Sequence, residues 1–142
     1  MSDISSTILV VDDDPGVTTA VRLRLEDAGF RCLVAHGGAQ GLAQFQRHEP
    51  DLVVTDGSMP VGDGPTLVRA IRSTSTTPIV LLSGFASQYE AQMDVDENTK
   101  ILQKPYDGDV LTGLVMALLY HADEQTETAD ELEDGPTWTN AA

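Results

Sequence analysis

Short, unbroken apolar runs separated by longer segments limit the folds that this chain can adopt. Four runs occupy residues 8–11, 32–35, 52–54 and 79–82, and a weaker run lies at 101–102. None of them alternates polar and apolar residues, so each predicted strand is expected to be covered on both faces, as in a parallel sheet. Parallel strands need crossover connections, which helices usually supply. The alternation therefore predicts an α/β fold with five parallel strands.

The segments between these runs carry apolar residues at helical spacing. The residues that form these stripes are Val17, Val21, Leu25, Leu42, Phe45, Leu67, Val68, Ile71, Val110, Leu111, Leu114, Val115, Leu118 and Leu119. Residues 86–93 are a weaker helix candidate, and residues 94–100 are predicted to form a polar loop. The expected architecture is a single doubly wound, flavodoxin-like sheet with strand order 2-1-3-4-5. In this order the carboxyl ends of strands one and three meet where such folds bind ligands.

Acidic residues are concentrated near the C-terminus. Residues 123–142 hold 7 of the 23 acidic residues and none of the 8 basic ones. This segment has too few apolar side chains to offset the entropy lost on ordering. We therefore expect an N-terminal extension over residues 1–6, one domain over 7–122 and a disordered acidic tail over 123–142. The tail cannot form an output domain, so we expect a free-standing domain, with a fragment of a larger hybrid kinase as the open alternative.

The overall charge and the single cysteine exclude several classes of protein. A formal net charge of -15 disfavours direct binding to nucleic acid or to anionic membranes. The apolar runs are only as long as strands, and the first residues lack the pattern of a secretory signal. Cys32 is the one cysteine, so no disulfide framework or cysteine-based metal site is available. These features predict a soluble, cytoplasmic protein.

Carboxylates follow two of the predicted strands. Asp12, Asp13 and Asp14 come directly after the first strand, and Asp56 comes after the third. Two like charges about 4 Å apart repel by about 4 kcal/mol at an effective dielectric constant near 20, so this cluster needs a cation, a shared proton or a lysine. Oxygen ligands without histidine or cysteine suit Mg²⁺. Asp14 is expected to cap a helix that begins at Pro15.

The fourth and fifth strands lead to the same rim of the sheet. Ser83 and Gly84 follow the fourth strand, and Lys104 and Pro105 follow the fifth. The Ser83 hydroxyl and the Lys104 ammonium are suited to hold the oxygens of a phosphoryl group. Gly84 leaves space for an incoming group.

Five ordered motifs of this chain resemble the receiver domain of two-component response regulators. The resemblance covers about residues 7–121. The motifs are Ile8-Leu9-Val10-Val11-Asp12-Asp13-Asp14-Pro15, Asp51-Leu52-Val53-Val54-Thr55-Asp56, Met59-Pro60-Val61-Gly62-Asp63-Gly64, Leu81-Leu82-Ser83-Gly84 and Gln103-Lys104-Pro105-Tyr106.

The resemblance implies a role for each acidic residue of the rim. Asp56 corresponds to the phosphoacceptor, which takes a phosphoryl group from a histidine kinase or a phosphotransfer protein and becomes an aspartyl phosphate. Asp12 and Asp13 correspond to the acids that bind Mg²⁺. Asp13, Asp56 and the main-chain carbonyl of Ser58 are the implied direct ligands. Because phosphoryl transfer depends on positioning and charge neutralisation, these roles agree with the chemistry of the residues.

The resemblance also implies a switch. Lys104 pairs with the acids and then with the phosphoryl oxygens, Ser83 moves toward the phosphate, and Pro105 is a candidate for a cis peptide bond. Ile101 departs from the family, which usually has an aromatic residue there that rotates with the hydroxyl residue. Residues 85–99 also lack the usual alanine-rich fourth helix and are more similar to receivers associated with hybrid histidine kinases.

The sequence thus predicts a phosphoacceptor that signals by binding an unidentified target protein or by relay, and that catalyses only its own phosphorylation and dephosphorylation. One alternative is a haloacid-dehalogenase-type phosphatase with Asp12 as nucleophile, Asp14 as acid, and Ser83 and Lys104 as further motifs. Gly16 breaks that pattern, which also leaves Asp56 without a role. A degenerate receiver that binds partners without phosphorylation is the second alternative.

Overall fold

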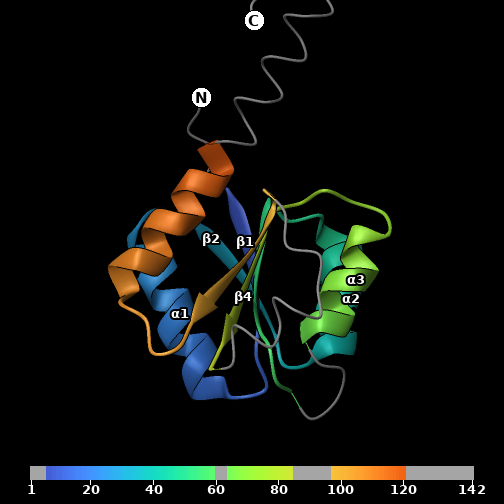
Figure 1. The fold of residues 1–142 in the computed structure, drawn as a ribbon, viewed down its shortest axis with the longest axis horizontal. Coiled ribbons are helices and arrows are strands. Elements are labelled where there is room, and N and C mark those ends of the chain that lie inside the picture. Colours follow the sequence, from blue (N-terminus) through green and yellow to red (C-terminus); the bar gives the residue numbers. More distant parts are fainter. Residues whose placement is uncertain (1–5, 60–63, 85–96, 121–142) are drawn as a thin grey trace, which may run out of the picture.

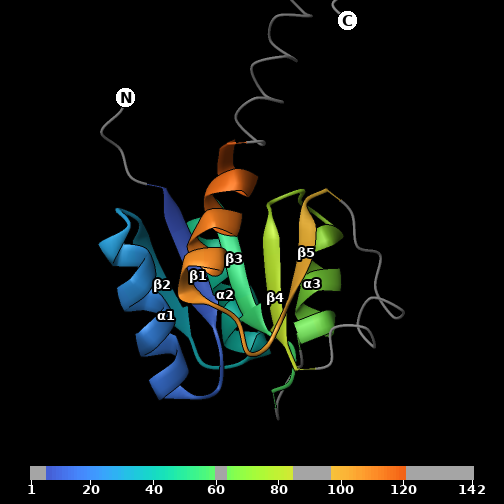
Figure 2. The same ribbon diagram turned by 60° about the vertical axis from the view of Figure 1, so that its left-hand side comes forward.

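A five-stranded parallel sheet forms the centre of the molecule. The computed structural model describes residues 6–59, 64–84 and 97–120. The strands are β1 (Thr7–Val11), β2 (Arg31–Ala35), β3 (Leu52–Asp56), β4 (Ile79–Ser83) and β5 (Thr99–Gln103). Their order is β2-β1-β3-β4-β5, and every neighbouring pair is parallel (Figure 2). The predicted α/β class, doubly wound topology and strand order are confirmed.

Helices cover both faces of the sheet (Figure 1). Helix α1 (Pro15–Asp27) and a C-terminal helix over residues 108–120 lie on one face. Helices α2 (Gly38–His48) and α3 (Gly64–Arg72) lie on the other. Each face has its own apolar core, because alternate residues of each strand point to opposite sides. In the described part of the chain, no helix is long and apolar enough to cross a bilayer.

The turn from β1 into α1 has the predicted capping geometry. The Asp14 side chain accepts a hydrogen bond from the Gly16 N–H at 2.9 Å, and Pro15 begins the helix. Proline has no N–H to lose at this position, and the cap satisfies one of the free donors of the first turn. Asp14 is therefore used in starting α1, and the two aspartates before it lie at the end of the sheet.

The start of β5 differs from the prediction. The segment 94–100 was expected to be a loop, but Thr99 and Lys100 belong to the strand. Thr99 is fully buried, and its hydroxyl accepts a hydrogen bond from Arg72 Nε at 2.9 Å. Arg72 also donates to the main-chain carbonyl of Asn98 at 2.7 Å. This contact from α3 satisfies a polar residue at a core position. The helix predicted over 86–93 and the tail over 123–142 lie outside the described residues.

Gly64 begins α3 directly against the end of β3. A Cβ built on Gly64 would overlap the main-chain oxygen of Asp56 and would lie 2.6 Å from Leu81 Cδ1 and 2.8 Å from Gly57 Cα. We therefore expect Gly64→Ala to lower the free energy of unfolding by about 2 kcal/mol, the usual cost of overfilling a packed site. Urea denaturation measures this loss. Gly113→Ala is the matched control, because a Cβ there meets no atom within 4 Å among residues 6–59, 64–84 and 97–120. An equal loss in both variants would contradict the packing argument.

Candidate functional site

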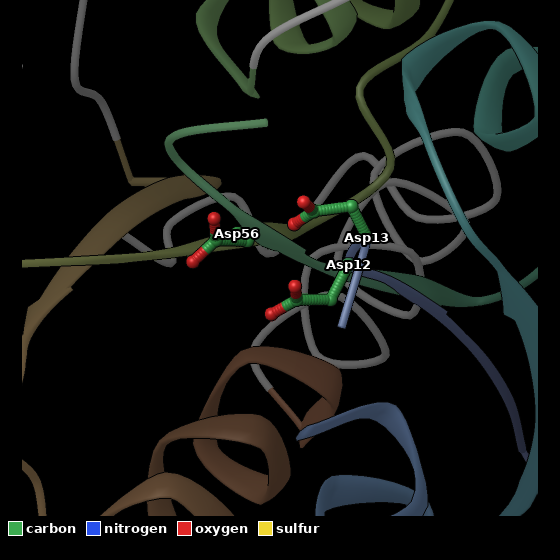
Figure 3. A group of neighbouring side chains, drawn as sticks. All are labelled: Asp12, Asp13 and Asp56. Atoms are coloured by element: carbon green, nitrogen blue, oxygen red, sulfur yellow. The ribbon is translucent and has the colours of Figure 1, made fainter. Parts of the chain in front are cut away.

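Three carboxylates meet where β1 and β3 end. Asp12 and Asp13 directly follow β1, and Asp56 is the last residue of β3. These strands are neighbours in the sheet, so their ends are brought together. One oxygen atom from each of the three carboxylates lies within 4.8 Å of the other two, and Figure 3 shows the side chains around a common space. Asp12 and Asp56 are buried, with 4% and 6% of their surface exposed, whereas Asp13 is exposed.

Both carboxylate oxygens of Asp56 accept hydrogen bonds. Lys104 Nζ donates to Oδ1 at 2.5 Å, and the Ser58 N–H donates to Oδ2 at 3.0 Å. The Asp14 N–H donates to Asp12 Oδ1 at 3.0 Å. Asp56 is thus held in place by the Lys104 ammonium on one oxygen and by a main-chain N–H on the other. The residues predicted from the strand ends are brought together, and the ligand role of the Ser58 carbonyl stays a prediction.

The charges of the cluster are only partly balanced. The pKa of Asp12 is raised from 3.8 to about 6, chiefly by burial and in addition by the neighbouring Asp56 charge, against the opposing hydrogen bond from the Asp14 N–H. Burial alone would lower the pKa of Lys104, but its hydrogen bond and its attraction to Asp56 outweigh burial and raise it. One lysine therefore faces more negative charge than it neutralises, which is an arrangement that favours a bound cation.

The raised pKa of Asp12 predicts how stability depends on pH when no divalent cation is present. Between pH 3.8 and about 6 the folded state binds more protons than the unfolded state, so the free energy of unfolding falls as the pH rises through this window. The loss is complete by about pH 7, one unit above the folded-state pKa, and amounts to roughly 1–2 kcal/mol once solvent screening at this rim is included. We expect Asp12→Asn to remove it, which makes the variant more stable than the wild type at pH 7.5 in EDTA and equal to it near pH 3.5.

Urea denaturation of both proteins across this pH range measures the difference in their free energies of unfolding. Taking this difference cancels the titration of groups that do not interact with Asp12. Asparagine keeps an Oδ1 acceptor for the Asp14 N–H, so the substitution changes charge more than shape. Adding Mg²⁺ at pH 7.5 is expected to stabilise the wild type more than the variant. If the difference in stability between the two proteins does not change with pH, the pKa of Asp12 is not raised in the folded state.

The remaining predicted residues lie at the ends of β4 and β5. Ser83 is buried at the end of β4, and its main-chain carbonyl accepts a hydrogen bond from the Lys104 N–H at 2.8 Å. The peptide bond between Lys104 and Pro105 is cis. Ile101 pairs with Leu81 and packs against the core on the α2 and α3 side. The switch roles of Ser83 and Ile101 stay predictions.

Sequence reasoning missed one polar residue beside this site. The Gln103 side chain donates hydrogen bonds to the main-chain carbonyls of Gly84 and Lys104. A glutamine at the end of a strand does not by itself indicate such a contact, because glutamine is common at any exposed position of this kind. Its partners are main-chain atoms, which a sequence pattern does not identify.

The comparisons with known proteins decide the family. Residues 8–116 match the family model of the response regulator receiver domain. The chain belongs to this family. The receiver domain therefore has a phosphoacceptor role in two-component signalling, as the sequence predicted.

Curated relatives of this receiver domain are transcriptional regulators. It is 33% identical over 138 residues to the transcriptional regulatory protein CseB of Streptomyces coelicolor, a match that covers 93% of this chain and 59% of that protein. It is 32% identical to the transcriptional regulatory protein CpxR of Escherichia coli, with 87% of this chain and 54% of that protein covered. The chain thus spans between about half and three-fifths of the length of these relatives.

Solved receiver structures have the same fold. The receiver domain from the hybrid histidine kinase CckA is 28% identical, has a TM-score of 0.67 and aligns over 80% of this chain and 98% of that one. The Vibrio cholerae chemotaxis protein CheY4 is 28% identical, has a TM-score of 0.72 and aligns over 81% of this chain and 99% of that one. Receiver domains generally bind Mg²⁺ at an acidic pocket, and this chain has such a cluster of aspartates.

Proposed function

We propose that Asp56 is the phosphoacceptor of this receiver domain. The observation that carries the proposal is the arrangement of its side chain. Asp56 lies within the three-carboxylate cluster, while Lys104 contacts one of its oxygens and a main-chain N–H contacts the other. Asp12 faces the same space but has no lysine hydrogen bonded to it among the described contacts. The geometry therefore favours Asp56 over Asp12 as the nucleophile.

The residues of the site fit Mg²⁺, and its proposed ligands are Asp13, Asp56 and the Ser58 carbonyl, with Asp12 beside them. All are oxygen ligands, which Mg²⁺ prefers, and the pKa of Asp12 is raised by its burial and by the charge of Asp56, which a bound cation would balance. Mg²⁺ supplies positive charge to the phosphoryl oxygens when it is bound. Its water ligands make a site with few protein ligands sufficient.

In the proposed reaction, a carboxylate oxygen of Asp56 forms a bond to phosphorus while the donor's N–P bond breaks. The electron pair of that bond goes to the donor nitrogen of a phosphohistidine, which takes up a proton. Lys104 holds the carboxylate in place before transfer and neutralises charge on the phosphoryl oxygens during it. The chain is thus a phosphoacceptor that assists a reaction on itself, and we propose no activity on other substrates.

The new charge on Asp56 is proposed to shift an equilibrium between two conformations. Ser83 ends the neighbouring strand and is placed to contact the phosphoryl group in one of them. Phosphorylation favours that conformation only by the difference between its interactions in the two states. Ile101 is aliphatic and half-buried, so we propose that the switch works without a rotating aromatic ring at this position.

The proposed partners are a histidine kinase or phosphotransfer protein as donor, and a target protein that distinguishes the two conformations. The net charge of -15 supports signalling by protein contact, because it opposes direct binding to nucleic acid or anionic lipid. We propose the cytoplasm as the place of action, because histidine kinases draw their phosphoryl groups from ATP there.

The test is phosphorylation of the full chain by phosphoramidate, a small donor with an N–P bond, in the presence of Mg²⁺. Intact mass spectrometry is expected to show one added phosphoryl group, and peptide mapping is expected to place it on Asp56. EDTA is expected to slow the reaction. Label on Asp12 would favour the phosphatase alternative, and no label at all would favour a receiver that binds partners without phosphorylation.

A further inference from the structure

Gln103 connects the two strand ends that carry Ser83 and Lys104. It is the last residue of β5 and pairs with Ser83, the last residue of β4. Its Nε2 donates one hydrogen bond to the Gly84 carbonyl at 2.9 Å and one to the Lys104 carbonyl at 2.8 Å. Both N–H bonds of one amide are thus used on the main chain of two different segments. We call these two contacts the Gln103 bridge.

The bridge contacts a residue that has open space beside its Cα in the described part of the chain. Gly84 is exposed, and a Cβ built on it would meet no atom of the described residues within 4 Å. A residue without packed neighbours is displaced at little steric cost. The Gln103 amide therefore supplies a specific contact to the chain directly after Ser83. The strand end before it is tied to β5 by the main-chain hydrogen bond from Lys104 to Ser83.

The bridge also lies on the face of β5 that the proposed switch uses. Ile101 and Gln103 are two residues apart on the strand, so their side chains share one face. They pair with Leu81 and Ser83, which share the same face of β4. The aliphatic Ile101 side chain packs in the core and has no polar group, whereas Gln103 contacts the segment that begins at Ser83.

We propose that Gln103 is a positioning residue that holds the Ser83–Gly84 segment in its unphosphorylated arrangement and so opposes activation. The proposal rests on the proposed function of Asp56 and Ser83. If Ser83 moves toward a phosphoryl group on Asp56, the adjoining Gly84 carbonyl moves with it, and the Gly84 contact of the bridge is lost. The bridge therefore stabilises one of the two conformations and shifts their ratio by that difference.

The test measures how tightly beryllofluoride, a mimic of the aspartyl phosphate, binds the full chain at saturating Mg²⁺. Gln103→Met keeps the length of the side chain and removes both donors. We expect its apparent Kd for beryllofluoride to fall about fivefold, the factor that corresponds to one net hydrogen bond between neutral groups. Without beryllofluoride, the Gly84 amide resonance in a ¹H–¹⁵N spectrum is expected to move from its wild-type position toward its position in the beryllofluoride-bound protein.

A second variant and a control separate this role from general stability. Gln103→Glu keeps the shape but replaces the donor group with an acceptor, so its Kd is expected to shift in the same direction. Gln46→Met is the matched control. Gln46 lies in α2 and lines a pocket with Pro50 and Thr77, at the end of the sheet opposite to Ser83. This change is expected to leave the Kd unchanged. A loss of thermal stability without a change in Kd or in the Gly84 resonance would indicate a structural role only and overturn the proposal.

The outcomes distinguish this proposal from the one on which it rests. An unchanged or raised Kd in both Gln103 variants overturns the restraint, while wild-type phosphorylation on Asp56 still supports the proposed function. If the wild type binds no beryllofluoride and takes up no phosphoryl group on Asp56, the proposed function fails and the restraint fails with it. Tighter binding in both variants, with Gln46→Met unchanged, supports both.

Discussion

Asp56→Asn is expected to take up no phosphoryl group from phosphoramidate under conditions in which the wild type is fully labelled. The amide lacks the negative charge that makes the carboxylate a nucleophile, while its size and shape are nearly the same. An amide oxygen also still accepts a hydrogen bond from the Ser58 N–H, which contacts Asp56 at 3.0 Å in the wild type. Intact mass spectrometry over a time course measures the loss. A wild-type level of label in the variant would remove Asp56 from the reaction.

Asp12→Asn is the matched comparison, because it removes a neighbouring buried carboxylate from the same cluster. If Asp56 is the nucleophile, this variant is expected to become labelled more slowly and to reach one phosphoryl group per chain. The slower rate follows from weaker cation binding, and a higher Mg²⁺ concentration is expected to restore part of it. Complete loss of label in Asp12→Asn together with full label in Asp56→Asn would instead support the phosphatase alternative.

The pattern of the strands could be predicted because it depends on local composition. The apolar runs at 8–11 and 52–54 lie in β1 and β3. These runs do not alternate polar and apolar residues, which indicated strands covered on both faces and hence a parallel sheet. The beginning of β5 could not be predicted in this way. Thr99 and Lys100 resemble loop residues in sequence, and the hydroxyl of the buried Thr99 has its partner in Arg72, 27 positions earlier. Such a contact depends on the folded structure.

The candidate site also has features that could be predicted from the sequence and features that could not. Asp12, Asp13 and Asp56 could be predicted to meet because the order of parallel strands fixes which strand ends are neighbours. The same topology places Lys104 at this edge of the sheet, but β4 separates β3 from β5, so its pairing with the acids was implied by the family resemblance alone. The raised pKa of Asp12 could not be predicted, because it depends on how fully this side chain is buried. The Gln103 bridge could not be predicted either, since it joins an amide to two main-chain carbonyls.

Lys104→Met is expected to slow phosphorylation by phosphoramidate about a hundredfold, the usual loss when one group that stabilises a transition state is removed. Methionine keeps an unbranched side chain of similar length and removes the ammonium that contacts Asp56 Oδ1. That ammonium also lowers the pKa of Asp12, so its loss leaves the cluster with more uncompensated negative charge. The initial rate of label uptake, measured by mass spectrometry at fixed Mg²⁺, tests this expectation.

Lys100→Met is the matched control, because Lys100 is the other lysine of the chain and lies in β5, which Lys104 directly follows. Its rate is expected to stay within about twofold of the wild type, since Lys104 alone makes the ion pair with Asp56 among the described residues. Raising the Mg²⁺ concentration distinguishes two roles for Lys104. If the lysine only balances charge before transfer, excess Mg²⁺ restores the rate of Lys104→Met. If it contacts the transferring phosphoryl oxygens, as we expect, the rate stays low even when Mg²⁺ is saturating, because the cation already occupies its own position.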